Sequence, residues 1–393
     1  MVTSCNCKME QYLSTTINKL NTKEFNNLNL VLGNESCDLD SAVCAIVYAS
    51  FLDWQYNQIK CKVCTKTHRD PQFFKDDIFV PILNVERQDY ELKTEVAFCL
   101  KDHGINETNL VFRDDHDLVQ LTGSAKTNVV LVDHHVLAAK DQFLAPYVTE
   151  IIDHRPLQEW NYRDDTRSTM EVVGSCATLV AQRIKDLSTL LAYEMAFFQS
   201  HPVCTQLVHC AIVLDTVNFS KEVNKATPHD EEMVLFLEHL IKPVCSQSLR
   251  KTQLDRLVAA RSDVSNLNPA QLLRKDVKIL GDVLVPSFPI MVKDFLQRPG
   301  ALTAMGEALK KQECSLALLL GMDLKGGLRR DMAVYCPDDP GKGEKLMKFL
   351  QDWTSPAFQL SPEENSCPYS IQLNLSASRK QYMPAVKEFL NMK

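Results

Sequence analysis

The sequence has 393 residues, which is enough for two domains at the usual size of roughly 100–200 residues each. Hydrophobic residues make up 45% of it and charged residues 24%, a balance that is typical of globular proteins and excludes a disordered chain. The formal net charge of −7 argues against a general nucleic-acid binder, because such proteins normally carry a basic face.

No run of about 18 apolar residues is present, so we expect neither a membrane span nor a membrane partner. The first residues, MVTSCNCKMEQYL, lack the apolar centre of a signal peptide, and we expect a cytoplasmic protein with the nucleus as a second location. Cys61 and Cys64 form a CxxC pair near His68, but no second pair follows at zinc-ligand spacing. We therefore interpret residues 55–77 as a surface insertion of unassigned function.

The first part of the chain alternates short apolar runs with helical patterns. Helices are predicted at 41–54, from about 174 onward and at 206–214. Buried strands are predicted at 29–33, 78–83, 109–112, 128–133 and 150–153. Short buried strands separated by helices are typical of a parallel sheet with helices on both faces, so the fold class is α/β.

The second part predicts a smaller α/β domain with a mixed sheet. Its predicted helices lie at 249–261, 269–275, 302–311, 343–353 and 383–392, and its predicted strands at 277–284, 315–322, 332–336 and 369–375. The helical and strand patterns weaken between these two parts. We therefore place a first domain at 1–230, a linker at 231–248 and a second domain at 249–393.

Four polar clusters each follow a predicted apolar strand. They are GNESCDLDS at 33–41, Asp133-His134-His135, Asp153-His154-Arg155 and Asp215-Thr216-Val217-Asn218. Ligands bind beyond the carboxyl ends of the strands in an open parallel sheet, so these clusters are expected to converge. Carboxylate and imidazole side chains together can hold two divalent cations, which activate a water and stabilise the leaving oxygen in phosphoryl transfer. The alternative is that each cluster only caps a helix or forms a turn.

The segments GNESCDLDS, LVDHH, IIDHRP and LDTVNF resemble the four signature motifs of the DHH phosphoesterase superfamily. Within it they look like the prune-type exopolyphosphatases, which are related to family II inorganic pyrophosphatases. The second part resembles the DHHA2 domain, which closes over the active site in this subfamily. The resemblance implies hydrolysis of terminal phosphoanhydride bonds in short-chain inorganic polyphosphate, with release of orthophosphate.

The resemblance also implies two cations per active site, Mg²⁺ or Mn²⁺. Asp38 would bind one cation and Asp40 the other, and Asp133 would bridge them. His154 and Asp215 would complete the second site. Asn34 stands where the pyrophosphatases have a histidine ligand, and we count it among the substrate contacts. Its amide oxygen is a harder ligand than imidazole and favours Mg²⁺ over Mn²⁺.

Other residues match positions expected to meet the substrate phosphates. Arg155 replaces a second histidine of the pyrophosphatase motif, and a guanidinium there can hold a phosphate with two hydrogen bonds. His134 and His135 adjoin the bridging carboxylate, and either could contact substrate. The predicted catalytic residues are Arg155, His134 and His135 together with Asp38, Asp40 and Asp133. In the second domain, the matching basic residues are Lys278, Arg379 and Lys380, for which a solvated basic face is the alternative.

Two other functions are consistent with the same residues. One is a phosphodiesterase acting on a cyclic nucleotide or an oligonucleotide, although the sequence offers no clear aromatic residue on which a base would stack. The other is a regulatory protein that retains the fold and binds partners. For this function the resemblance suggests nucleoside diphosphate kinase as a partner.

Overall fold

The computed structural model describes residues 6–63, 75–241, 247–323, 327–363 and 367–392. The chain forms two compact units, Met1–Arg261 and Ser262–Lys393. This division falls later in the chain than the predicted linker at 231–248, because the first unit also contains the helices α8 (Pro228–Leu240) and α9 (Gln247–Ser262). The CxxC motif and His68 fall on residues whose side chains the structure does not describe.

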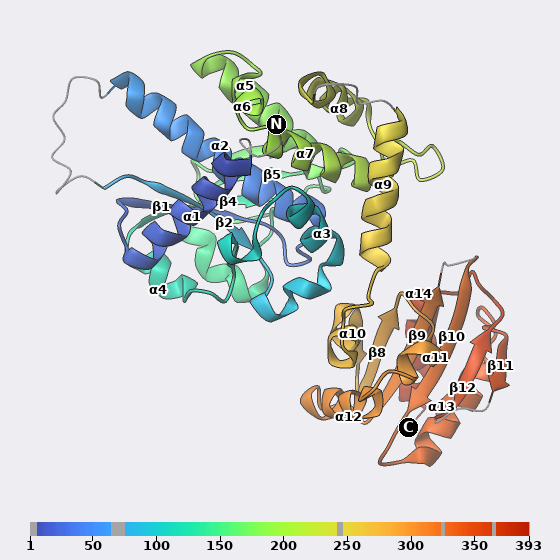
Figure 1. The fold of residues 1–393 in the computed structure, drawn as a ribbon. Coiled ribbons are helices and arrows are strands. Elements are labelled where there is room, and N and C mark those ends of the chain that lie inside the picture. Colours follow the sequence, from blue (N-terminus) through green and yellow to red (C-terminus); the bar gives the residue numbers. More distant parts are fainter. Residues whose placement is uncertain (1–5, 64–74, 242–246, 324–326, 364–366, 393) are drawn as a thin grey trace. The chain divides into compact units, whose positions relative to one another are not determined.

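The first unit is built on a six-stranded sheet in which every strand is parallel to its neighbours (Figure 1). The strand order is β3-β2-β1-β4-β5-β6. The strands are β1 (Asn27–Leu32), β2 (Ile78–Leu83), β3 (Val111–Phe112), β4 (Lys126–Val132), β5 (Val148–Asp153) and β6 (Arg167–Met170). All six residues of β2 are buried, as expected for a strand covered on both faces. The sequence did not predict β6, because this edge strand is polar and partly exposed.

Helices cover both faces of this sheet, and each face has its own apolar core. The α-helices that precede α8 are α1 (Asn6–Thr22), α2 (Leu39–Val63), α3 (Thr94–Asp102), α4 (Leu118–Gly123), α5 (Cys176–Leu191), α6 (Ala196–Ser200) and α7 (Pro202–Asp215). Three 3₁₀ helices lie at Arg87–Leu92, Glu107–Asn109 and Ala139–Tyr147. Helix α2 packs against α5 and α7, which explains why its first half is buried on every side. The predicted α/β class with a helix-covered parallel sheet is confirmed.

The second unit has a mixed six-stranded sheet, as predicted, in the order β11-β12-β10-β9-β8-β7. Only β8 and β9 pair in parallel. The strands are β7 (Val277–Leu280), β8 (Val283–Phe288), β9 (Leu316–Asp323), β10 (Arg329–Tyr335), β11 (Leu360–Glu363) and β12 (Tyr369–Gln372). The helices are α10 (Pro269–Lys275), α11 (Val292–Leu296), α12 (Ala301–Lys311), α13 (Pro340–Asp352) and α14 (Arg379–Asn391). The predicted strand at 277–284 is in fact a hairpin, because Gly281 turns the chain at a φ of +57°.

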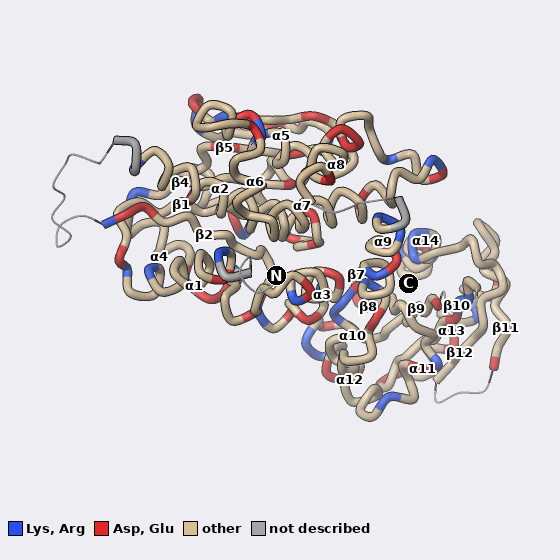
Figure 2. Tube along the Cα trace, turned by 45° about the horizontal axis from the view of Figure 1, so that its top comes forward, with Lys and Arg blue, Asp and Glu red and all other residues tan. Residues whose placement is uncertain are grey.

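Acidic and basic residues are interspersed in both units (Figure 2). In the described part of the chain, no helix is both long enough and apolar enough to cross a bilayer.

Candidate metal centre

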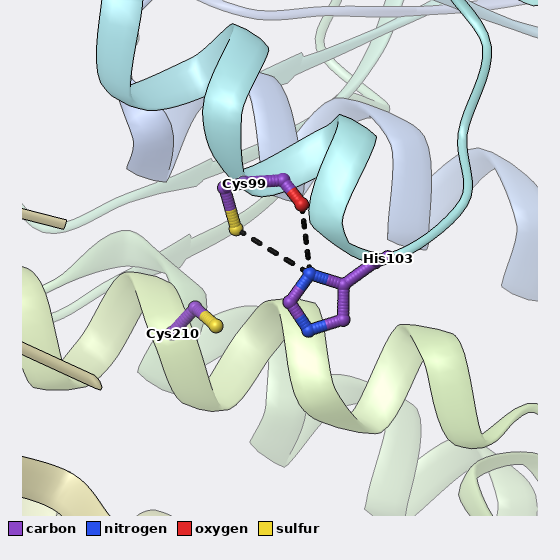
Figure 3. Close-up of side chains that lie close together, drawn as sticks. All are labelled: Cys99, His103 and Cys210. Atoms are coloured by element: carbon purple, nitrogen blue, oxygen red, sulfur yellow. Dashed lines mark hydrogen bonds between the residues drawn. The ribbon is translucent and has the colours of Figure 1, made fainter. Parts of the chain in front are cut away.

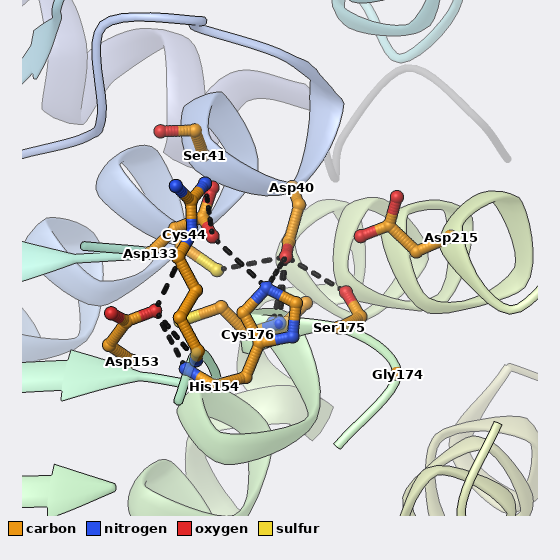
Figure 4. A network of polar contacts seen from close by, with 12 residues as sticks. Asp40, Ser41, Cys44, Asp133, Asp153, His154, Gly174, Ser175, Cys176 and Asp215 are labelled. Atoms are coloured by element: carbon orange, nitrogen blue, oxygen red, sulfur yellow. Dashed lines mark hydrogen bonds and ion pairs between the residues drawn. The ribbon is translucent and has the colours of Figure 1, made fainter. Parts of the chain in front are cut away.

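The polar clusters of the four motifs lie near the point where the strand order of the first sheet reverses. The chain leaves β1 toward β2 on one side, whereas β4 and β5 lie on the other. The loops after β1, β4 and β5 therefore open into one crevice at the carboxyl edge, which is where open α/β sheets bind ligands. Asp40, Asp133 and His154 follow these three strands (Figure 4).

Asp40 is held by the amino-terminal end of α5. Both of its carboxylate oxygens accept hydrogen bonds there, from the backbone N–H of Cys176 (2.7 Å) and Ala177 (2.8 Å) and from Ser175 Oγ (2.9 Å). The unpaired N–H groups and the dipole of a helix amino terminus favour a negative charge at this position. The buried carboxylate is therefore fixed in orientation although it lies in the first turn of a different helix, α2.

Asp133 directly follows β4 and has a left-handed backbone, with a φ of +60°. Its Oδ2 accepts a hydrogen bond from Asn34 Nδ2 at 2.5 Å. Its Oδ1 is buried and accepts no hydrogen bond, although His154 Nε2 lies 3.2 Å away and Arg155 Nη2 lies 3.6 Å away. A buried carboxylate oxygen without a hydrogen bond is uncommon, and it is an available ligand for a cation.

His154 is oriented in the manner of a metal ligand. Its Nδ1 lies 2.9 Å from the carbonyl oxygen of Val173, which leaves Nε2 facing Asp133 and, at 3.9 Å, Asp40 Oδ2. One ligand atom from each of Asp40, Asp133 and His154 lies within 4.8 Å of the others. A backbone acceptor on the far ring nitrogen is the usual support of a metal-bound histidine.

The electrostatics of this group also favour a cation. Burial and then the neighbouring carboxylate charges raise the pKa of Asp40 and of Asp133 to about 6. Burial lowers the pKa of His154, but Asp133 and Asp40 outweigh it and raise the value to about 9. Crowded carboxylates resist ionisation unless positive charge lies between them, and a divalent cation supplies that charge. The donor set and its open oxygen therefore fit Mg²⁺ or Mn²⁺.

The other two predicted ligands border this group. Asp38 accepts a hydrogen bond from the backbone N–H of Ser41 at 3.2 Å, and its charge contributes to the raised pKa values of Asp40 and Asp133. Asp215 lies at the end of α7, where burial and then Asp40 raise its pKa well above the usual range. The expectation that this fourth cluster follows a strand is wrong, because an apolar run of this length also fits a buried helix.

Asn34 meets Asp133 through its amide nitrogen. From the sequence, its Oδ1 is considered as a hard ligand for a cation. In the structure, Oδ1 accepts hydrogen bonds from Ser36 N (2.8 Å), Ser36 Oγ (2.7 Å) and Cys37 N (3.2 Å). Gly33, the preceding residue, admits no side chain, since a Cβ there would lie 2.4 Å from Ser41 Oγ. The GNES turn is thus shaped to hold Asn34 against Asp133.

The two histidines after Asp133 differ in their surroundings. His135 uses both ring nitrogens, because Nδ1 pairs with Asp153 and Nε2 accepts from Gln158 N at 3.0 Å. His134 lies with Nδ1 3.0 Å from the Val132 carbonyl oxygen and lines a cavity of about 300 Å³, together with Asn34 and Arg155. His134 therefore borders a space that a ligand could enter.

Two further residues support this group, although the sequence motifs assign neither of them a metal or substrate contact. Asp153 is completely buried and accepts from the backbone N–H groups of His154 (2.7 Å) and Arg155 (3.3 Å). Ser175 was predicted only as the start of a helix, which is confirmed, but its bond to Asp40 spans 135 residues. Asp153 was visible within the motif IIDHRP, whereas no sequence signal links Ser175 to Asp40.

The predicted phosphate-binding residues of the second unit lie on β7 and at the start of α14, which pack together (Figure 2). Lys278 and Lys380 are exposed. Arg379 is largely buried, and its guanidinium donates to Asp276 Oδ1 (2.6 Å) and to the Asp276 carbonyl oxygen (2.9 Å). Of these three cations, Arg379 is therefore the one already engaged within its own unit.

Comparison with known proteins identifies the family of this chain. The DHHA2 domain family matches residues 255–389. Exopolyphosphatase PRUNE1 of Rattus norvegicus is 33% identical over 393 residues, an alignment that covers 98% of this chain and 79% of the rat protein. The chain belongs to the prune-type exopolyphosphatase family. The human PRUNE1 exopolyphosphatase is 31% identical, with 98% of this chain and 80% of the human protein covered.

A solved structure from Methanococcus jannaschii, described as a family II inorganic pyrophosphatase, also aligns with this member of the prune family. It is 19% identical, with a TM-score of 0.49, and the alignment covers 92% of this chain and 98% of that one.

Proposed function

We propose that this chain is a metal-dependent exopolyphosphatase that removes terminal orthophosphate from short-chain inorganic polyphosphate. One observation carries the proposal: Asp40, Asp133 and His154 converge at the sheet reversal and leave a buried carboxylate oxygen without a hydrogen bond. Relatives aligned over nearly the whole chain are named exopolyphosphatases, which supports the substrate class.

Five side chains would hold two divalent cations, Mg²⁺ or Mn²⁺. They are Asp38, Asp40, Asp133, His154 and Asp215. When bound, the two cations would supply an acidified water and stabilise negative charge on the phosphoryl and leaving oxygens. The amino terminus of α5 favours the ionised form of Asp40 and orients it, and the Val173 carbonyl orients His154.

The remaining roles belong to side chains around the cavity. Arg155 is half-exposed beside Asp133, so its guanidinium can bind two oxygens of a phosphate group and stay charged at any working pH. His134 is neutral at pH 7, because burial lowers its pKa, and can hydrogen-bond the same phosphate. Lys278 and Lys380 would bind more distant phosphates. Arg379 would have to leave Asp276 before it could do so.

A phosphate-release assay tests the substrate class. Pyrophosphate, tripolyphosphate, long-chain polyphosphate and a cyclic nucleotide are each supplied with Mg²⁺ or with Mn²⁺. We expect the highest kcat/KM with tripolyphosphate and no release without a divalent cation. Nucleotide monophosphate release that exceeds phosphate release would favour the phosphodiesterase function. Hydrolysis of none of these substrates would favour a regulatory role.

The variants D38A and D133N test the site. Each should lower phosphate release by at least about 100-fold, because each removes a predicted cation ligand. The matched control is D165N, since Asp165 is exposed and pairs only with Arg163 among the contacts described for it. Circular dichroism checks that all variants fold. Wild-type activity in a folded D133N protein would overturn the assignment.

Nucleoside diphosphate kinase binding remains a prediction of the resemblance, and a cytoplasmic or nuclear location remains a prediction from the first residues of the sequence. Titration calorimetry with the purified kinase tests the first of them, and D133N provides the comparison. Equal binding by wild type and D133N would separate partner binding from hydrolysis.

A further inference from the structure

A second group of metal-binding side chains lies in the first unit, built from residues that the carboxylate centre does not use. Cys99 is on α3, His103 directly follows that helix, and Cys210 is on α7 (Figure 3). One ligand atom from each lies within 4.8 Å of the others. Cys210 precedes Asp215 by five residues, about 140° around the helix, so the two side chains leave α7 on different sides.

We propose that Cys99, His103 and Cys210 form a binding site for Zn²⁺. Two thiolates and an imidazole are the ligands that Zn²⁺ prefers, whereas Mg²⁺ takes oxygen ligands. Around a tetrahedral Zn²⁺, bond lengths of about 2.3 Å to sulfur and about 2.0 Å to nitrogen place the two atoms roughly 3.5 Å apart. Cys99 Sγ and His103 Nδ1 lie 3.8 Å apart. Binding of a cation would thus require these two ligand atoms to move only slightly closer together.

The local backbone favours this arrangement. Cys99 and His103 are four residues apart, so both side chains lie on the same face of the helix end. The Nδ1 atom of His103 lies 2.8 Å from the carbonyl oxygen of Cys99. Nδ1 would exchange this contact for the cation, and Nε2 would then carry the ring proton.

The surroundings leave room for a fourth ligand. The three residues line a cavity of about 250 Å³ whose further wall includes Gln253 and Arg256 of α9. The Gln253 side-chain amide donates to the sulfur of Cys210.

The neighbouring His209 and Asp102 are already engaged with other side chains. His209 Nε2 lies 3.0 Å from Glu238, and Asp102 accepts from Arg256 at 2.7 Å. Three protein ligands and a water from the cavity would therefore complete the coordination. Binding would release one proton from each thiol to the buffer and form two sulfur–zinc bonds.

Cobalt substitution in the full-length reduced protein tests the site. After treatment with a chelator, Co²⁺ should produce thiolate-to-cobalt absorption in the near ultraviolet and tetrahedral bands in the visible. One equivalent of Zn²⁺ per chain should remove both, and excess Mg²⁺ should remove neither. The double variant C99S/C210S should lose the bands. Bands that persist in this variant, or a reduced wild-type protein without them, would overturn the proposal.

Two variants separate this site from other thiols. Cys204 is buried on the same helix with its sulfur 3.9 Å from Ser50 Oγ, so C204S should keep the bands. C61S/C64S should also keep them. Loss of the bands in C61S/C64S alone would assign the metal to the CxxC motif and refute the proposal.

Because replacing buried cysteines can unfold a protein, His103→Gln provides a further measurement. His103 is only partly buried, so H103Q should fold and retain phosphate release. Zn²⁺ should raise the melting temperature of the wild type and of C204S, but raise it much less in H103Q. An equal Zn²⁺-induced rise in H103Q would contradict the assignment of the imidazole.

Discussion

At the scale of single residues, Asp133 combines features that are unfavourable in a folded protein. It has a left-handed backbone, a buried oxygen without a hydrogen bond and a raised pKa. A buried polar group without a hydrogen bond is costly, although the ion pair with His154 at 3.2 Å offsets part of this cost, and such features gather at functional sites. A bound cation would remove the electrostatic part of this cost. The same reasoning makes Asn34 a supporting residue, because it stabilises the other oxygen of the same carboxylate.

Arg155 gives a prediction at this scale, which depends on the proposed function. R155A should lower kcat/KM for tripolyphosphate roughly 10- to 150-fold, the equivalent of losing hydrogen bonds to a charged group worth about 1.5–3 kcal/mol. R155K should recover only part of the loss, because an ammonium lacks the paired donors of a guanidinium. R163A is the control, since Arg163 is exposed and pairs with Asp165. Full activity of R155A in steady-state assays would exclude a phosphate contact.

The buried His201 leads us to expect that the free energy of unfolding depends on pH, independently of catalysis. Burial, with the charge of Lys8 adding to it, lowers the pKa of His201 from 6.5 to about 4, against the opposing effect of the Phe197 carbonyl. The folded state therefore favours the neutral ring. This contribution to stability is fully present above pH 6.5 and is lost progressively as the pH falls toward 4.

The non-titrating variant H201N tests this prediction. As the pH falls from 6.5 to 4, the free energy of unfolding of the wild type, measured by urea titration, should fall relative to that of H201N. H239N serves as the control, because His239 is exposed and its curve should follow the wild type. Parallel curves for wild type and H201N would refute the assignment.

At the scale of elements, helix α5 links two distant parts of the centre. Its amino terminus binds Asp40, which belongs to α2, through two backbone N–H groups and one hydroxyl. The loop just before α5 is held in turn by Asp230 of α8, which accepts from the backbone N–H of Gly174 at 2.8 Å. A Cβ at Gly174 would lie 2.9 Å from that carboxylate, so glycine is needed for the close approach. The positions of the predicted cation ligands thus depend on the packing of the helices as well as on the conformation of the loops.

Ser175→Ala tests this linkage. Removing one hydrogen bond from Asp40 should weaken the Mg²⁺ affinity about 10- to 100-fold, as is typical when a residue behind a metal ligand is changed. The kcat at saturating Mg²⁺ should change much less. Ser188→Ala is a matched control, because Ser188 is buried on the same helix and its Oγ has no hydrogen-bond partner. Equal Mg²⁺ affinity of S175A and S188A would show that Ser175 does not position Asp40.

At the scale of the whole molecule, the chain has separate apolar cores in its two units. All five predicted cation ligands belong to the first unit, whereas Lys278, Arg379 and Lys380 belong to the second. Binding of cations should therefore stabilise one unit directly and leave the intrinsic stability of the other unchanged.

Calorimetry tests this separation. Mg²⁺ at 100 times its Kd should add about 2.7 kcal/mol to the stability of the first unit and raise its unfolding transition. The transition of the second unit should not shift, and D133N should abolish most of the effect. A single transition that shifts as a whole, or an Mg²⁺ effect preserved in D133N, would contradict the prediction.

The sequence by itself determined the elements whose signals are local. The run IFVPIL predicts β2 with its observed bounds, because six consecutive apolar residues suit a strand buried on both faces. The helix α10 was predicted at its observed bounds from its helical pattern, and in the structure Asn268 caps it and Pro269 begins it. The polar side chains Asp40, Asp133 and His154, which follow β1, β4 and β5, were expected together because parallel strands end at the same edge.

Only the tertiary structure decided the contacts that join distant segments. Asp215 lies at the end of a helix, and His135 pairs with Asp153. Asp40 is bound by the start of α5, which lies 135 residues further along the chain. The thiol–imidazole group likewise unites residues that are more than a hundred positions apart. Side-chain orientation in these cases depends on packing between elements, and periodicity within one segment carries no information about it.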